Sequence, residues 1–220
     1  MRPTSEPSRP RAGSAADPRQ LGRREQGAQT RETLLDAAAI EFERRGVAGT
    51  RIEDVAQRAS VTRGALYFHF KTVENMARVI LENQDDIWPD IISDVRSRDL
   101  RGLAAVRELS ARVVNRTQDD LRMRAGMLIA GEMGEQNTLR AFFQRWQDAL
   151  IPLLQQAIAD REISDDVDIR VTAAVVVQAA WGVLLVAREF GTAGGVGEQF
   201  DSMWVHLLQG LQAGQRSDSA

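Results

Sequence analysis

The sequence predicts an all-α protein of about nine or ten helices. Apolar residues recur three and four positions apart along most of the 220 residues, which is the spacing of helices with one buried face. No stretch alternates apolar and polar residues as a half-buried strand does. Between Thr50 and Lys71, two short amphipathic segments are joined by the turn Ser60-Val61, which is the pattern of a helix-turn-helix. These observations predict an amino-terminal three-helix domain followed by a larger helical domain.

Composition and periodicity divide the chain into four segments. The first residues are rich in Pro, Arg, Ser and Gly and lack periodicity, which favours a disordered arm. The helix-turn-helix domain comes next, then a domain with large apolar helices, then a polar tail. The expected bounds are 1–27 for the arm, 28–88 for the helix-turn-helix domain, 89–214 for the second domain and 215–220 for the tail.

The first expected helix runs from about Thr30 to Arg45, and Gly46 is placed as its C-cap. The first helix of the helix-turn-helix comes next, with Thr50 and Glu53 at the spacing of a capping box. Thr62 follows the turn and can cap the second helix with its hydroxyl. The caps therefore predict where both helices of the motif begin.

The second helix of the motif carries three apolar residues that are expected core contacts, Leu66, Phe68 and Phe70. A further helix is expected from about Thr72 to at least Gln84. Pro89 should kink or end that helix, because proline has no N–H to donate and clashes with the preceding turn.

Six more helices are expected in the second domain, over about 90–98, 100–116, 119–133, 138–160, 168–190 and 198–211. Pro152 should bend the fourth of these locally. The helix over 168–190 is apolar almost all round and must be covered on every face. Together with the last helix it predicts a symmetric dimer built as a four-helix bundle.

Composition excludes several classes of protein. The chain has no cysteine for disulfides or thiolate metal sites. Neither a signal peptide nor an apolar run of membrane-spanning length is recognised, so a cytoplasmic location is expected. Residues 1–71 hold 13 Lys and Arg against 9 Asp and Glu, whereas the remainder is acidic. A basic end on an acidic body suits a protein that docks on phosphate through one end.

The segment I-E-D-V-A-Q-R-A-S-V-T-R followed by G-A-L-Y-F-H-F-K resembles the DNA-binding domain of TetR-family repressors. The resemblance covers residues 28–88 and implies a dimer that places a recognition helix in each half of a palindromic operator. Arg63 is the candidate for guanine readout, and Gly64 lets the helix backbone approach closely. The remaining candidate DNA contacts, to phosphate, are Thr50, Thr62, Tyr67, His69 and Lys71.

A second resemblance points to the γ-butyrolactone-type autoregulator receptors of actinomycetes. It rests on G-A-L-Y-F-H-F, Gln84, R-A-G at Arg124–Gly126 and the aromatic pair near Phe143–Trp146. It implies that a small lipophilic effector lies under Trp146 and controls antibiotic biosynthesis genes by quorum-type signalling. An apolar pocket with a few polar anchors suits such a molecule. The candidate ligand-binding residues are Gln84, Trp88, Met127, Trp146, Gln178 and Trp181.

No constellation for catalysis is found. The two histidines are His69, inside the DNA motif, and His206 near the carboxyl end. No catalytic residue, metal site or cofactor is therefore expected, and the protein is not expected to be an enzyme. Two alternatives stay open: a pseudo-receptor or other TetR-like regulator that responds to an antibiotic or another small molecule, and a helical interaction protein with a vestigial DNA motif.

Overall fold

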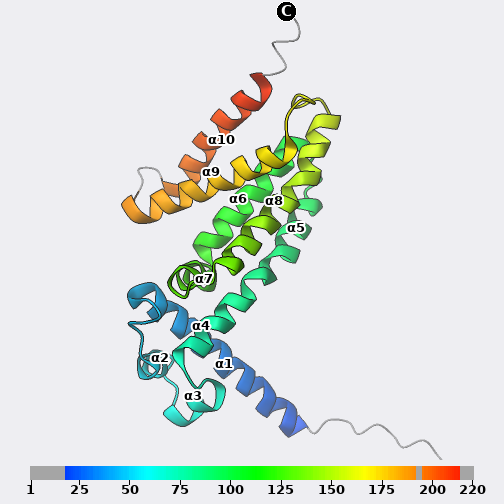
Figure 1. Ribbon diagram of the computed structural model, residues 1–220. Helices are drawn as coiled ribbons and strands as arrows, with labels where there is room; N and C mark the ends of the chain where they lie inside the picture. The colour runs from blue at the N-terminus through cyan, green and yellow to red at the C-terminus, as the bar shows by residue number, and fades with distance from the viewer. Residues whose placement is uncertain (1–17, 192–194, 214–220) are drawn as a thin grey trace, which may run out of the picture.

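The computed structural model describes residues 18–191 and 195–213, and within them the chain is helical, with no strand (Figure 1). The predicted all-α fold class is confirmed. The helices are α1 (Pro18–Arg45), α2 (Ile52–Arg58), α3 (Arg63–His69), α4 (Val73–Glu82), α5 (Ile87–Ser97), α6 (Gly102–Asp119), α7 (Leu121–Glu132), α8 (Gln136–Ala159), α9 (Ile169–Phe190) and α10 (Gly195–Ala213), with a 3-10 turn at Asn83–Asp86.

The amino-terminal domain packs around the apolar face of α1. Leu34, Leu35 and Phe42 of α1 lie in one buried cluster with Leu66 of α3 and Met76 of α4. Helix α7 also contributes to this cluster through three residues, Ala125, Ile129 and Ala130. The core of the helix-turn-helix domain is therefore completed by a helix that lies outside residues 28–88.

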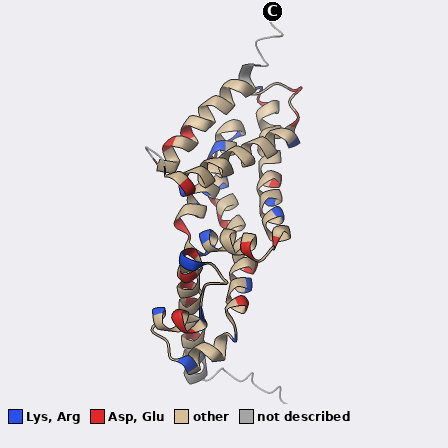
Figure 2. Cartoon of the chain, turned by 60° about the vertical axis from the view of Figure 1, so that its left-hand side comes forward, with Lys and Arg blue, Asp and Glu red and all other residues tan. Residues whose placement is uncertain are grey.

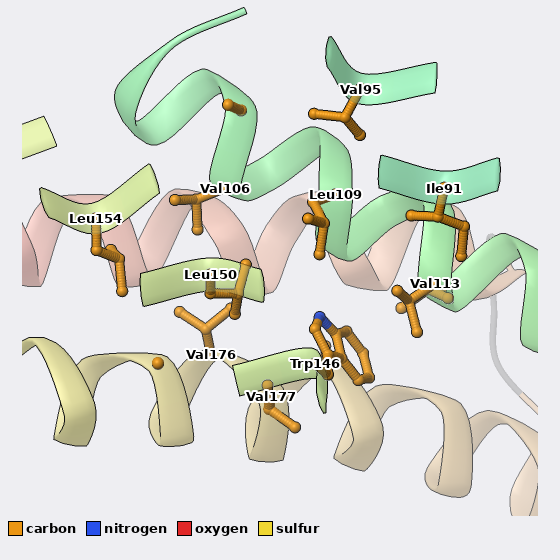
Figure 3. Close-up of a cluster of buried hydrophobic side chains, with 14 of the residues drawn as sticks. Ile91, Val95, Val106, Leu109, Val113, Trp146, Leu150, Leu154, Val176 and Val177 are labelled. Carbon is orange, nitrogen blue, oxygen red and sulfur yellow. The ribbon is translucent and has the colours of Figure 1, made fainter. Parts of the chain in front are cut away.

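The carboxy-terminal domain is built on α8, which is buried between α6 and α9. Figure 3 shows Trp146, Leu150 and Leu154 of α8 between Val106 of α6 and Val176 of α9. The apolar spacing of α8 continues through Pro152, which lies inside the helix. Helix α10 packs against α9 at the outer side of this bundle.

Several predicted boundaries were wrong at the amino end. Helix α1 begins at Pro18 rather than near Thr30, so residues 18–27 are helical and are not part of a disordered arm. Residues 1–17 and the predicted tail at 215–220 lie outside the described residues. Gly46 ends the helix as predicted, with a φ of 72° that favours glycine.

The cap of α2 also differs from the prediction. The helix begins at Ile52, and its N-cap is Arg51, which makes no side-chain cap hydrogen bond. The Thr50 hydroxyl instead donates to the carbonyl of Gly46 at 2.7 Å. Thr50 is therefore used to close the turn after α1, and its side chain is buried.

Pro89 does not end a helix. The chain leaves α4 at the 3-10 turn, and Pro89 lies in the first turn of α5. Proline is tolerated there because the first N–H groups of a helix have no intrahelical acceptor. The break between the two helices therefore comes before the proline.

Helix α9 contradicts the expectation that the chain has no apolar run of membrane-spanning length. By length and composition alone it could cross a membrane, with a mean hydropathy of 1.9. In the structure it packs against α8, α6 and α10, and 28% of its most apolar window is buried. One side of α9 thus belongs to the core, and an apolar side stays uncovered in the single chain.

Candidate nucleic-acid interface and effector cavity

Helix α3 presents one face outward and is anchored by the other. The Thr62 hydroxyl accepts a hydrogen bond from the N–H of Ala65 at 3.3 Å, which confirms Thr62 as the N-cap. Leu66 and Phe70, four residues apart, are buried in the domain core. The exposed residues at helical spacing are Arg63, Gly64, Tyr67, Phe68 and Lys71.

A buried carboxylate fixes α2 against α1. Glu41 of α1 is 2% exposed, and its carboxylate accepts a hydrogen bond from Arg58 Nε of α2 at 2.5 Å. Arg45 of α1 in turn pairs with Asp54 of α2 at 3.0 Å. Because α3 follows α2 after a short turn, these ion pairs hold the angle at which α3 leaves the domain.

Glu53 of α2 holds two side chains of the exposed face in place. It accepts from the Tyr67 hydroxyl at 3.4 Å, and its carboxylate lies 3.6 Å from the Arg63 guanidinium. Both contacts are exposed to water and contribute little to stability. The Lys71 ammonium donates to the Tyr67 carbonyl at 2.7 Å and so caps the end of α3.

A basic hollow of about 260 Å³ borders the exposed face and includes residues that the sequence analysis missed. His69 and Lys71 line it, together with Arg31 of α1 and Arg78 of α4. Arg31 lies over the Phe70 ring at 5.5 Å from its centroid. The sequence shows both arginines, one on the first helix and one on the fourth. Only the packing of the helices reveals that both side chains face the same hollow.

The amino end of α4 is occupied by hydrogen bonds to its own side chains. The Thr72 hydroxyl accepts from the Asn75 N–H at 3.2 Å. Hydrogen bonds to its own backbone and to Thr72 lower the pKa of the Glu74 carboxyl. A carboxylate and a hydroxyl therefore already use the first amides of this helix.

Helix α7 ties the two domains together through charged side chains. Arg122 donates to Glu32 at 2.6 Å and to Asp36 at 2.8 Å, both on α1. Arg124 pairs with Glu43 of α1 at 2.7 Å, and this hydrogen bond raises the pKa of the arginine.

The carboxyl end of α7 holds the turn that leads into α2. The Glu132 carboxylate accepts from the backbone N–H groups of Val47 at 2.7 Å and Ala48 at 2.8 Å. With the arginine pairs at its amino end, α7 is fixed to α1 at both ends.

A cavity of about 610 Å³ opens where α7 meets α1, α6, α9 and α10. Two predicted ligand residues, Met127 and Trp181, line it. The Glu43–Arg124 ion pair and Arg188 form its polar side. The rest of its apolar wall includes residues that were not predicted, Leu128, Leu184, Leu185 and Val196. This cavity is thus amphipathic and touches α7, the helix that packs against the helix-turn-helix domain.

Trp88 and Trp146 lie in the closed core and not in this cavity. Trp146 is 0% exposed, and Figure 3 shows it between Leu109 and Val113 of α6 and Val177 of α9. The indole N–H groups of Trp88 and Trp146 have no hydrogen-bond partner among residues 18–191 and 195–213. Two buried donors without acceptors are unusual in a protein interior.

An aromatic chain connects the closed core to the cavity. The Phe142 ring lies 5.3 Å from Trp88 and 6.4 Å from Trp146, between ring centroids. Phe143 lies 5.7 Å from Phe142 and 5.0 Å from Trp181 of the cavity wall. Of these five aromatic side chains, three belong to α8, Trp88 belongs to α5 and Trp181 to α9. Because the contacts join three helices, the sequence could not show them.

The two predicted glutamine anchors differ in position. Gln84 is buried and donates to the carbonyls of Ile80 at 2.9 Å and Arg122 at 3.1 Å, between α4 and α7. Its carboxamide rests on Gly126, where a Cβ atom would lie 2.4 Å away. Gln178 is exposed on α9 and is not among the residues that line the cavity.

Comparison with known proteins gives a consistent picture for the amino end. Residues 34–79 match the family model described as bacterial regulatory proteins, tetR family. Over 102 residues the chain is 33% identical to a probable HTH-type transcriptional regulator, ArpR of Pseudomonas putida, which covers 46% of this chain and 49% of that protein. The chain therefore spans about half the length of the first curated relatives that it matches.

Other matches extend over both domains. The A-factor receptor protein of Streptomyces griseus is 25% identical over 194 residues, 87% of this chain and 67% of that protein. A crystal structure of a γ-butyrolactone receptor, an ArpA-like protein, is 28% identical with a TM-score of 0.69, covering 84% of this chain and 89% of that one. CprB of Streptomyces coelicolor, in complex with its biological operator sequence, is 29% identical with a TM-score of 0.68, covering 84% and 90%.

Proposed function

We propose, from the premise that this chain is a TetR-family transcriptional regulator, that it represses transcription in the cytoplasm by binding a palindromic operator as a homodimer. A small lipophilic signalling molecule of the γ-butyrolactone, butenolide or furan type releases it, and antibiotic biosynthesis genes are the expected targets. The observation that carries the proposal is the exposed face of α3. Its inner side is locked by Leu66 and Phe70, and its outer side offers Arg63, Tyr67 and Lys71.

The uncovered apolar side of α9 supports the homodimer. From Val171 to Ala187 this helix has no charged residue, and Figure 2 shows few charges along the two helices at the top of the molecule. The exposed apolar side chains there are Val171, Val175, Leu185, Val186, Phe190 and Val205. Exposed apolar patches of this kind mark protein interfaces, and a two-fold contact through them would present two copies of α3.

The orphan indole donors support a neutral effector rich in oxygen acceptors. A buried polar group without a partner costs about 1–3 kcal/mol. A ligand that enters from the cavity must displace Phe143 and Phe142, which separate Trp181 from the two indoles, to supply acceptors to Trp88 and Trp146, and it then recovers that free energy. A lactone or furan ring offers such oxygens on an otherwise apolar body. The cavity beside Trp181 is large enough for the tail of such a molecule, because ligand pockets span about 300–1,000 Å³.

Release of DNA follows if the effector moves α7. Met127 and Arg124 of this helix line the cavity, while Arg122, Arg124 and Glu132 hold α1 and the turn before α2. An effector that binds better to a second position of α7 shifts the dimer toward that position. Operator affinity then falls by the ratio of the effector's affinities for the two states.

The test begins with operator selection from a random DNA pool with the full-length protein. Fluorescence anisotropy then measures the affinity for the selected DNA while alkyl-substituted γ-butyrolactones, butenolides, furans and a panel of antibiotics are added. We expect a palindrome to be enriched and one of the first three compound classes to lower operator affinity. Enrichment without a palindrome would refute dimeric operator binding, and release by antibiotics alone would refute the proposed effector class.

Trp146→Phe tests whether the Trp146 N–H binds the effector, since phenylalanine keeps an aromatic ring and lacks the N–H donor. We expect effector affinity to fall about tenfold, the value of one hydrogen bond, while operator affinity without effector stays unchanged. Trp204→Phe is the matched control, because Trp204 is a buried tryptophan of α10 whose N–H is not among the orphan donors. An equal loss in both variants would show that the Trp146 N–H has no part in effector binding.

A further inference from the structure

Phe68 is a large apolar side chain that the fold leaves in water. It is 80% exposed, although its neighbours Leu66 and Phe70 on the same helix are buried. The prediction that Phe68 is a core contact was wrong because residues two apart on a helix lie about 200° apart around its axis. Residues 66 and 70 share the inner face, so 68 must point outward.

The surroundings of Phe68 leave room for another molecule. Gly64 precedes it by four residues and lies on the same face, and a Cβ atom at Gly64 would meet nothing within 4 Å. On the other side the His69 ring meets the Phe68 ring edge to face, with centroids 5.1 Å apart and planes at 87°. The ring is therefore restrained on one side and open on the other.

We propose that Phe68 is a specificity-determining residue whose ring contacts the C5-methyl group of a thymine in the major groove. This inference rests on the proposed operator binding. The thymine methyl is the apolar group among the base edges in the major groove, whereas the other edge groups donate or accept hydrogen bonds. A phenyl ring placed against those polar groups would remove their water without replacing its hydrogen bonds, so a thymine is favoured at that position.

With both Arg63 and Phe68 exposed on α3, each half-site has two different readers. Arg63 offers a guanidinium fork that matches guanine, and Phe68 offers an apolar surface that matches thymine. Tyr67 and Lys71, on the same outward face, carry groups suited to phosphate. The structure thus assigns base discrimination to two side chains of α3 and not to one.

The test removes one methyl group from the DNA. In the operator selected with the full-length protein, each thymine is replaced by uracil, symmetrically in both half-sites, and affinity is measured by anisotropy at fixed salt. For one thymine in each half-site, we expect its replacement by uracil to lower the affinity of that half-site about fourfold, which is the effect of one buried methyl group. Phe68→Ala should weaken the thymine operator and should show no further loss on the uracil operator.

This double-mutant cycle separates a direct contact from a general weakening. Phe68→Leu, which retains an apolar side chain, should retain part of the methyl dependence, and thermal unfolding of all variants should match the wild type because the ring is exposed. The inference would be overturned if the affinity losses from Phe68→Ala and from the uracil substitution simply added. It would also be overturned if Phe68→Ala changed the effect of no uracil substitution in the half-site. Either result would leave operator binding intact. A failure of the selection to yield any palindrome would instead count against the proposed function.

Discussion

At the scale of single residues, hydrogen bonds and an ion pair hold the exposed face of α3 in one arrangement in the free chain. Glu53 lies against both Tyr67 and Arg63, and Lys71 is held at the carbonyl of Tyr67. An arginine whose side chain is already held in one orientation loses less conformational entropy on binding than an arginine whose side chain is unrestrained. The exposed ion pair with Glu53 is weak enough to be exchanged for a base edge.

Arg63→Ala is expected to relax sequence specificity. A good bidentate contact to guanine discriminates by about 1–3 kcal/mol, so the selected operator should lose affinity while random DNA loses little. Tyr67→Phe and Lys71→Ala are the matched comparison, because phosphate contacts carry no sequence information. Lys71→Ala should weaken both DNAs and reduce the salt slope by about 1. Equal losses on both DNAs for Arg63→Ala would contradict its assignment as a base reader.

Gly126→Ala is expected to destabilise the protein by about 1–3 kcal/mol, as overpacking does. The new Cβ atom would lie 2.4 Å from the Gln84 carboxamide, which would have to leave its two carbonyl acceptors. Gly131→Ala on the same helix is the control, since its Cβ meets nothing within 4 Å. That change should stabilise by about 0.5–1 kcal/mol. Chemical denaturation measures both; a Gly126→Ala variant as stable as the wild type would show that Gln84 can move freely.

Sequence reasoning worked at the residues whose role depends on local spacing. The Thr62 cap and the Gly46 cap follow from neighbours in the chain. The burial of Trp146 also agrees with its apolar helical position. Phe68 was misplaced because its apolar character was given more weight than its angular position. The exposure of Gln178 depends on which face of α9 meets α8, and no local pattern carries that information.

At the scale of elements, the sequence does not show that α7 belongs to the cores of both domains. Met123 of this helix lies in the carboxy-terminal core, and Ala125, Ile129 and Ala130 lie in the amino-terminal core. A helix covered from two sides lacks a single apolar stripe, so its sequence does not reveal that it joins two domains. The existence of the helices was predictable from their period, whereas this double packing required the tertiary structure.

Glu132→Gln is expected to loosen the turn between α1 and α2. The carboxylate accepts from two backbone N–H groups, whereas a carboxamide has one oxygen and places an amino group where the second acceptor was. We expect a loss of about 1 kcal/mol in stability, because the site is partly exposed, and a lower operator affinity. Glu135→Gln, an exposed position just beyond α7, should change neither quantity. Unchanged operator affinity in Glu132→Gln would show that α7 does not control the position of α2.

At the scale of the whole molecule, charge and apolar surface are separated along its length. Residues 18–71 carry 10 Lys and Arg against 7 Asp and Glu. Helix α9, whose apolar side is uncovered, lies toward the other end of the molecule (Figure 1). Such a chain can join a copy of itself at one end while phosphate attracts the other. The cavity of about 610 Å³ lies between these ends, against α7, α9 and α10. A molecule bound there would contact both the helix that holds α1 and the helix whose apolar side is uncovered.

In the proposed mechanism operator recognition depends on the dimer, and the proposed dimer contact on α9 can be altered without changing the helix-turn-helix. Replacing both Val175 and Val186 by glutamate puts two charges into the apolar side of α9, where burial would cost several kcal/mol. We expect the mass in solution to fall from twice 24.4 kDa to 24.4 kDa. Linking two half-site readers raises avidity by about 100-fold or more, so operator affinity should fall at least that far while binding to one half-site persists.

Arg96→Glu controls for the added charge, because Arg96 is exposed on α5, which lies away from α10 in Figure 1. Light scattering gives the mass, and anisotropy on whole and half operators gives the two affinities. A double glutamate variant that stays dimeric would place the interface on another face. A monomer that binds the whole operator as tightly as the wild type would show that each chain reads its half-site without help from a partner, and the palindrome would then have no physical basis in this protein.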